Sequence, residues 1–292
     1  MFTSNSLRFV RGTGIVPAAV LIATLAFPGL AAAQMPANTS TTDTVGAPIG
    51  APNENWTFSL GLGAAAVPDY DGSEDYRAAP LPIFRAQKGH QYGALFGSRI
   101  TSNLIPHPNW RVGPIVEFIR KRSDVHNSKV DDMRTVDPAL MMGLQAGYDH
   151  TFGQSVLGAA VEWEHDVTGS NGGWLARPRV DYRRQLTKRL RMNIGTSMTY
   201  ASDDYMETYF SVGQREAAKT GFKRYDADAG LKDIGATATL TYSFNESWAL
   251  GGVVGYTRLL NDAKDSPLVD NVGNENQFLG GIFFTYNWQS GG

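Results

Sequence analysis

Apolar and polar residues alternate along the chain from Trp56 onward, in segments of about ten residues that turn-forming residues separate. In the segment QFLGGIFFTYNW (277–288), one phase ends in three aromatic residues and the other mixes apolar with small and polar residues. A period of two predicts a β-strand with one set of side chains on each face. The same pattern recurs in four further segments: 56–67, 190–200, 234–244 and 248–259. Alternation of this kind is typical of a transmembrane β-barrel with its apolar side chains facing lipid.

The lengths of the connections support this interpretation, because outer-membrane barrels have short periplasmic turns and long outer loops. Short connections are expected at 150–154, 186–189 and 245–247, and long ones at 120–137, 166–173, 201–233 and 260–276. Ten strands fit this alternation: 56–67, 91–100, 110–121, 138–150, 155–166, 174–186, 190–201, 233–244, 248–260 and 276–288. We therefore predict an all-β fold, a transmembrane antiparallel β-barrel of ten strands with long extracellular loops.

Residues 67–90 fit the ten-stranded barrel least well. Pro80 and Pro82 each remove a donor from a strand ladder, so this segment is predicted to be a long first loop. An extra hairpin here and a short strand in YMETYFSV (205–212) would give the alternative, a barrel of twelve strands. A soluble two-sheet sandwich also alternates, but segments of about ten residues have the length that crosses a bilayer when tilted.

Tryptophan positions follow from this topology. Four tryptophans fall at the periplasmic rim and two at the outer rim, namely Trp56, Trp110, Trp248 and Trp288, and Trp163 and Trp174. Aromatic residues are enriched at both membrane interfaces, so these six are predicted interface residues. The aromatic end of the last strand resembles the terminal signal by which outer-membrane barrels are recognised for insertion, although the tail 289–292 follows it.

Charged residues occupy the inward phase of one predicted hairpin. We predict a charge network in the lumen formed by Glu117, Glu162, Glu164, Arg177, Arg179, Asp181 and Arg183. Acids and bases on facing strands can pair across the sheet. On a sandwich the same residues would be the solvated face, so this feature alone does not decide the fold.

The N-terminus predicts export. Arg8 and Arg11 precede an apolar run that ends in Ala31-Ala32-Ala33, which is the pattern of a secretory signal peptide. We therefore divide the chain into a signal peptide (1–33), a flexible periplasmic leader (34–55), a barrel (56–288) and a short tail (289–292), with the cell outer membrane as the expected location. A net charge of −2 gives no support for a nucleic-acid partner, and the absence of cysteine excludes disulfides and thiolate sites.

Catalytic patterns are weak in this sequence, so we predict no enzyme, no cofactor and no metal site. His165 lies between two acids, but in a strand these point away from it, so a rim histidine is expected. Ser155 and Ser202 could be proposed as the serine of a lipid hydrolase, although any serine-rich rim offers such residues. The acidic loop with Asp262, Asp265 and Asp270 lacks a calcium-loop motif and is expected to be hydrated.

Three ordered blocks resemble the MipA/OmpV family of outer-membrane proteins. They are VPDYDGSEDYRAAPLP (67–82), YFSVGQREAAKTGFKRYDADAGLKD (209–233) and LLNDAKDSPLVDNVGNENQF (259–278). Phe222 is a departure, since the family usually has leucine after this glycine. The resemblance implies a Gram-negative outer-membrane barrel whose function is to scaffold peptidoglycan-remodelling enzymes.

The partners that this resemblance implies are a murein lytic transglycosylase and a peptidoglycan synthase, besides outer-membrane lipid. Two alternatives stay open: a small passive diffusion channel, and an adhesin that acts through its long outer loops. The resemblance carries no individual binding or catalytic residues.

Overall fold

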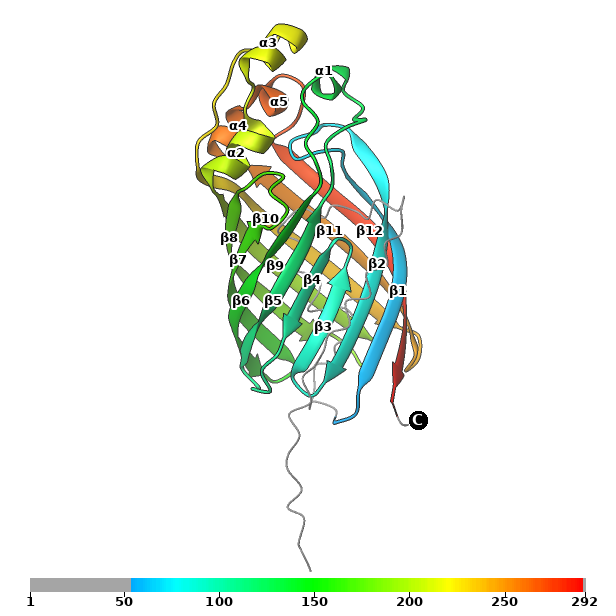
Figure 1. The fold of residues 1–292 in the computed structure, drawn as a ribbon. Helices are drawn as coiled ribbons and strands as arrows, with labels where there is room; N and C mark the ends of the chain where they lie inside the picture. The colour runs from blue at the N-terminus through cyan, green and yellow to red at the C-terminus, as the bar shows by residue number, and fades with distance from the viewer. Residues whose placement is uncertain (1–53, 291–292) are drawn as a thin grey trace, which may run out of the picture.

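The computed structural model describes residues 54–290, so the predicted signal peptide and nearly all of the predicted leader lie outside it. Within this part of the chain, twelve antiparallel strands close into one barrel, in the order β1-β12-β11-β10-β9-β8-β7-β6-β5-β4-β3-β2 (Figure 1). The strands are β1 (Thr57–Pro68), β2 (Tyr76–Lys88), β3 (Gln91–Phe96), β4 (Arg99–Asn103), β5 (Trp110–Ile119), β6 (Ala139–Phe152), β7 (Ser155–Asp166), β8 (Trp174–Gln185), β9 (Leu190–Ala201), β10 (Gly230–Ser243), β11 (Trp248–Leu259) and β12 (Asn276–Gln289).

Five short helices lie together at one end of the barrel, and the tight turns lie at the other, except for the β3–β4 turn, which closes a short hairpin within the wall (Figure 1). The helices are α1 (Ser128–Asp131), α2 (Asp203–Phe210), α3 (Gln214–Thr220), α4 (Asn261–Asp265) and α5 (Pro267–Asp270). None of the helices among residues 54–290 has the length and apolar composition that a membrane crossing requires. The long connections of the second half of the chain therefore share one end, as expected from their lengths.

The prediction of ten strands is wrong, and twelve is the observed number. The segment taken as a long first loop contains β2, and the strand predicted at 91–100 is a short hairpin of β3 and β4. The proposed route to twelve strands is also partly wrong, because residues 203–210 form helix α2 and not a strand. The added strand β2 and the division of the predicted strand 91–100 into β3 and β4 increase the count by two. Because two is an even number, β5 and every later strand keep their predicted direction.

Pro80 and Pro82 are accommodated in β2 because the strand is paired on one side only over its first half. β3 pairs with β2 from Ile83 to Lys88, whereas residues 76–82 pair with β1 alone. The Gly97 N–H donates to the Pro82 carbonyl at 2.9 Å, which places the backbone polar atoms of residue 82 on the β3 side. By alternation, Pro80 also turns its missing N–H toward this side, where no ladder bond is lost.

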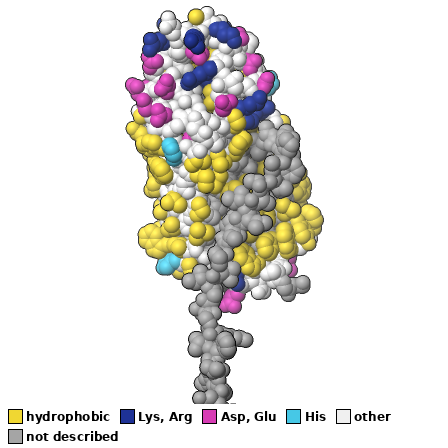
Figure 2. Space-filling model, in the orientation of Figure 1, with side chains coloured by type: hydrophobic (Ala, Val, Ile, Leu, Met, Phe, Trp, Pro, Cys, Tyr) yellow, Lys and Arg dark blue, Asp and Glu magenta, His cyan; other side chains and the backbone are white. Residues whose placement is uncertain are grey.

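Apolar side chains cover the outside of the barrel wall. Leu60, Leu62 and Ile282 are 57%, 65% and 65% exposed, whereas their inward neighbours Ser59 and Phe283 are buried. Figure 2 shows the same division on one face, with hydrophobic side chains around the wall and charged ones concentrated at the helix-bearing end. The alternation predicted from the sequence is thus an alternation between the outside and the lumen.

Replacing Ile282 by arginine is expected to destabilise the barrel by about 2–4 kcal/mol, because the charge would enter hydrocarbon in the middle of β12. The matched control is Asn276→Arg, which shares the phase of Ile282 at the first residue of the same strand, with an expected cost of about 0–1 kcal/mol. Urea unfolding in lipid vesicles measures both. Equal costs at the two positions would contradict a lipid-facing Ile282.

Candidate functional site

Ten charged side chains from five neighbouring strands form one ion-pair network inside the barrel. Its members are five arginines and five carboxylates: Arg99, Arg111, Arg177, Arg179 and Arg183, and Glu117, Asp149, Glu162, Glu164 and Asp181. The structure thus brings together all seven residues that the sequence analysis proposed for the lumen. Because positive and negative groups are equal in number, the network as a whole carries no net formal charge.

Arg99 and Arg177 share the same two glutamates at the centre of the network. Arg99 Nη2 lies 2.7 Å from Glu162 Oε2 and 2.6 Å from Glu164 Oε1, and Arg99 also pairs with Glu117. Arg177 Nη1 lies 3.1 Å and 2.9 Å from the same two oxygens. These contacts join β4 to β7 and β8 across the lumen. The buried positive charges of the arginines compensate the buried negative charges of the glutamates.

Three members were missed by the sequence analysis. Arg111 and Asp149 lie on the inward phases of β5 and β6, so the alternation contained the signal for both. The inward direction of Arg99 was not predicted, because this residue follows the tight turn between β3 and β4 inside a segment predicted to be one strand. It meets Glu162 and Glu164 from 63 and 65 residues away in the sequence, and no local pattern indicates that contact.

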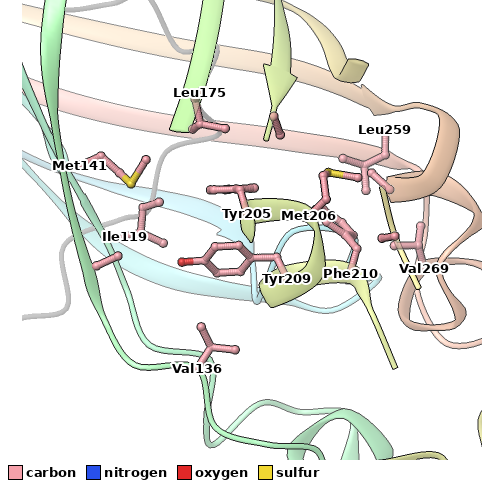
Figure 3. Close-up of a cluster of buried hydrophobic side chains, with 14 residues drawn as sticks. Ile119, Val136, Met141, Leu175, Tyr205, Met206, Tyr209, Phe210, Leu259 and Val269 are labelled. Atoms are coloured by element: carbon pink, nitrogen blue, oxygen red, sulfur yellow. The ribbon is translucent and has the colours of Figure 1, made fainter. Parts of the chain in front are cut away.

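The helix-bearing end carries a cap that α2 anchors. Tyr205, Met206, Tyr209 and Phe210 of this helix share one face and are all buried. Figure 3 shows them among side chains of the strand ends and the α5 segment, such as Met141, Leu175, Leu259 and Val269. The long outer connections are therefore packed onto the barrel and share its hydrophobic core at this end.

Two tyrosines keep their protons within the cap. Burial raises the pKa of Tyr209 to about 12, and burial followed by the charge of Asp262 raises the pKa of Tyr225 to about 12. The Tyr225 hydroxyl donates to the Asp262 carbonyl at 3.1 Å, and Asn171 Nδ2 lies 3.3 Å from the Tyr209 hydroxyl. Because neither phenol ionises near neutral pH, these bonds do not change over the physiological range.

The three sequence blocks 67–82, 209–233 and 259–278 meet at the same end. Lys232 Nζ of the second block lies 3.0 Å from the carboxylate of Asp71 in the first. Gln277 of the third block accepts from the Gly72 N–H at 3.2 Å and donates to the Ser73 carbonyl at 3.0 Å. The motifs that carry the family resemblance therefore build the junction between barrel and cap.

The six tryptophans proposed as interface residues divide between the two ends of the barrel. Trp56, Trp110, Trp248 and Trp288 lie at the tight-turn end, and Trp163 and Trp174 lie at the helix-bearing end. Each is at least 36% exposed on the outside of the barrel. Their contact with the membrane interface stays a prediction.

The residues considered for catalysis have structural contacts. Ser155 Oγ lies 3.0 Å from the Tyr182 hydroxyl, and Ser202 Oγ accepts from the Trp174 N–H at 2.9 Å. His165 stacks on Trp163 with ring centroids 6.3 Å apart. Among residues 54–290 no three histidine or acidic side chains are grouped so that they could hold a metal ion.

At the tight-turn end, the connection between β4 and β5 is the longest, and its backbone is fixed by its own side chains. Asn103 Nδ2 donates to the His90 carbonyl at 2.8 Å, and Asn103 Oδ1 accepts from the Val112 N–H at 3.0 Å. Asn109 Nδ2 donates to the Asp149 carbonyl at 2.8 Å. Between these anchors, Leu104 is 44% exposed, Ile105 is half-buried, and the Pro-His-Pro sequence 106–108 is exposed.

A family model described as MltA-interacting protein MipA matches residues 60–288. The chain belongs to this family. The MltA-interacting protein of Escherichia coli K12 is 24% identical over 224 residues, which cover 73% of this chain and 84% of the relative. OmpV of Vibrio cholerae is 29% identical over 127 residues, which cover 43% of this chain and 47% of the relative.

Among solved structures, an outer membrane channel from Pseudomonas putida F1 aligns with a TM-score of 0.44 and 11% identity, covering 82% of this chain and 97% of that one. The MipA-family relatives are named as outer membrane proteins or as an MltA-interacting protein, and none of these names denotes a catalytic activity. The protein is thus an outer-membrane β-barrel of the MipA family, as the three sequence blocks predicted.

Proposed function

We propose that this barrel is a non-enzymatic scaffold that holds a murein lytic transglycosylase, and with it a peptidoglycan synthase, at the inner face of the outer membrane. The observation that carries the proposal is family membership over residues 60–288, in a family described by its interaction with MltA. A role without catalysis is supported by the names of the family and its relatives, none of which denotes a catalytic activity.

The connection from Leu104 to Asn109 is our candidate for the partner contact. In a barrel with a periplasmic N-terminus, the tight-turn end faces the periplasm, where peptidoglycan-processing enzymes act. This connection is exposed at its centre and held at Asn103 and Asn109, so it presents Leu104 and two prolines with little conformational freedom to lose on binding.

Capture of a purified murein lytic transglycosylase by the refolded barrel in lipid nanodiscs tests the proposal. We expect binding by the wild type and a loss of at least about tenfold in affinity when residues 104–108 are replaced by glycine and serine, because the apolar contact is removed. Replacement of residues 245–247 in the β10–β11 turn is the matched control and should leave binding unchanged. Absence of wild-type binding would overturn the scaffold proposal, and equal binding by both variants would overturn this contact site.

A small diffusion channel is the second candidate, and the inner faces of β9 and β10 favour it. Both strands direct small residues inward, namely Gly195, Ser197, Thr199, Gly235, Thr237 and Thr239. These two strands follow directly on β8, so their small side chains leave room for solutes beside the ion-pair network. Discrete openings in a planar bilayer that Thr237→Trp reduces would support a channel, and a silent bilayer with confirmed insertion would contradict it. The adhesin alternative has less support, because the outer connections are packed into the cap.

A further inference from the structure

Five of the nine residues in RRQLTKRLR (183–191) are basic, and they surround the tight turn between β8 and β9. The fold divides them into two groups. Arg183 belongs to the ion-pair network of the lumen, and Arg191 shares the inward phase of β9. Arg184, Lys188 and Arg189 are exposed, and no ion pair found among residues 54–290 includes any of them. We call these three the basic turn.

Arg184 lies on the lipid-facing side of the barrel wall. It follows Tyr182 in the outward phase of β8, and the Tyr182 hydroxyl lies 3.0 Å from Ser155 Oγ. The Tyr182 ring stacks on Phe152 of β6 with centroids 6.4 Å apart, and Leu186 at the turn is 42% exposed. The cation thus ends a strip of aromatic and apolar side chains that the barrel presents to the membrane.

The basic turn is held in a fixed shape. Leu186 N–H donates to the Leu190 carbonyl at 2.9 Å, and Thr187 Oγ1 accepts from the N–H groups of Arg189 and Leu190 at 3.2 Å and 3.0 Å. The three cations therefore occupy neighbouring positions, and no carboxylate in the described range, residues 54–290, pairs with them. Between the strand ends, the other tight turns carry at most one formal charge each, Glu246 in the β10–β11 turn, and Lys88 is the last residue of β2.

We propose that the basic turn binds the phosphate of an anionic phospholipid in the inner leaflet of the outer membrane. Arginine and lysine bind phosphate oxygens through charge-assisted hydrogen bonds, and basic residues beside a membrane are attracted to anionic lipid. The exposed Leu186 and the aromatic rings of Tyr182 and Phe152 would contact the acyl chains next to that headgroup.

A lipid fits this site better than a soluble anionic polymer for two reasons. Arg184 is in the outward phase of β8 and Leu186 is exposed at the adjoining turn, so a ligand that contacts both lies at the membrane side of the wall. The stacked rings of Tyr182 and Phe152 form an apolar strip next to Arg184, which matches the acyl chains of a lipid. This inference does not depend on the scaffold proposal.

Native mass spectrometry of the full-length protein, titrated with phosphatidylglycerol or phosphatidylethanolamine, tests the proposal. We expect tighter binding of phosphatidylglycerol, and a loss on the order of 100-fold in its affinity in the variant Arg184→Gln/Lys188→Gln/Arg189→Gln, since each cation near the surface contributes about 1 kcal/mol. The matched control, Lys121→Gln/Lys223→Gln/Arg224→Gln, removes the same charge from exposed positions at the helix-bearing end and should bind like the wild type.

Three results would overturn the proposal. The first is equal affinity of the wild type for the two lipids, and the second is unchanged phosphatidylglycerol binding in the triple variant of the basic turn. The third is displacement of the lipid by soluble peptidoglycan fragments at equal concentration, which would identify an anionic polymer as the ligand. Glycerol phosphate without acyl chains should bind at least about tenfold more weakly than the lipid, because it cannot contact the apolar strip.

Discussion

Arg177→Ala is expected to destabilise the folded barrel by about 3–5 kcal/mol, since it leaves buried carboxylates without a partner. The Arg177 side chain is 1% exposed and lies 2.9 Å from Glu164 and 3.1 Å from Glu162, with Glu117 at 3.9 Å. Without it, Arg99 and Arg179 must compensate the same three glutamates. Urea unfolding of the refolded protein in lipid vesicles, followed by heat-modifiable gel migration, measures the loss.

Arg224→Ala is the matched control, because Arg224 pairs with Asp226 at 3.1 Å while both side chains are more than 60% exposed. A pair of this kind contributes about 0–1 kcal/mol. A double variant, Arg177→Met with Glu164→Gln, is expected to recover part of the lost stability, since it removes a charge of each sign. If Arg177→Ala unfolds at the wild-type urea concentration, the network does not hold the barrel together.

Phe210→Ala is expected to weaken the docking of the cap by about 3–5 kcal/mol while the barrel itself stays folded. Phe210 is fully buried and lies with Met206 of the same helix beside Leu259 and Val269 (Figure 3). Truncation removes the ring and leaves a cavity between α2 and the ends of the strands. Hydrogen exchange should therefore become faster in α2 and α3, and β-strand amides should keep their protection.

Glu207→Ala on the exposed side of α2 controls for the loss of side-chain atoms from this helix. It should leave hydrogen exchange in the cap at wild-type rates, because its side chain is not part of the buried cluster. Slow exchange throughout the cap in Phe210→Ala would show that the cap is held mainly by polar contacts such as Lys232 with Asp71.

Several features of this protein are local and were predictable from the sequence. In β1, β9, β10 and β12, the alternation within each strand is enough to identify the residues that face outward. The reason is that one face of each strand contacts lipid and the other face lines the lumen. Helix α2 shows the limit of this approach. Tyr205, Met206, Tyr209 and Phe210 are spaced as on one helix face, yet the aromatic composition of the segment made a short strand equally plausible.

The amino-acid pattern alone was enough to predict an outer-membrane barrel of the MipA family, long connections that share one end, and charged residues in the lumen. The number of strands depended on the tertiary structure, because β3 leaves one edge of β2 unpaired and so removes the need for the donors that Pro80 and Pro82 lack. The tertiary structure also established the partners of Arg99 and the meeting of the three family blocks at the cap. These contacts join residues that are tens to hundreds of positions apart, and barrel closure alone brings such residues within the few ångströms over which ion pairs and hydrogen bonds act.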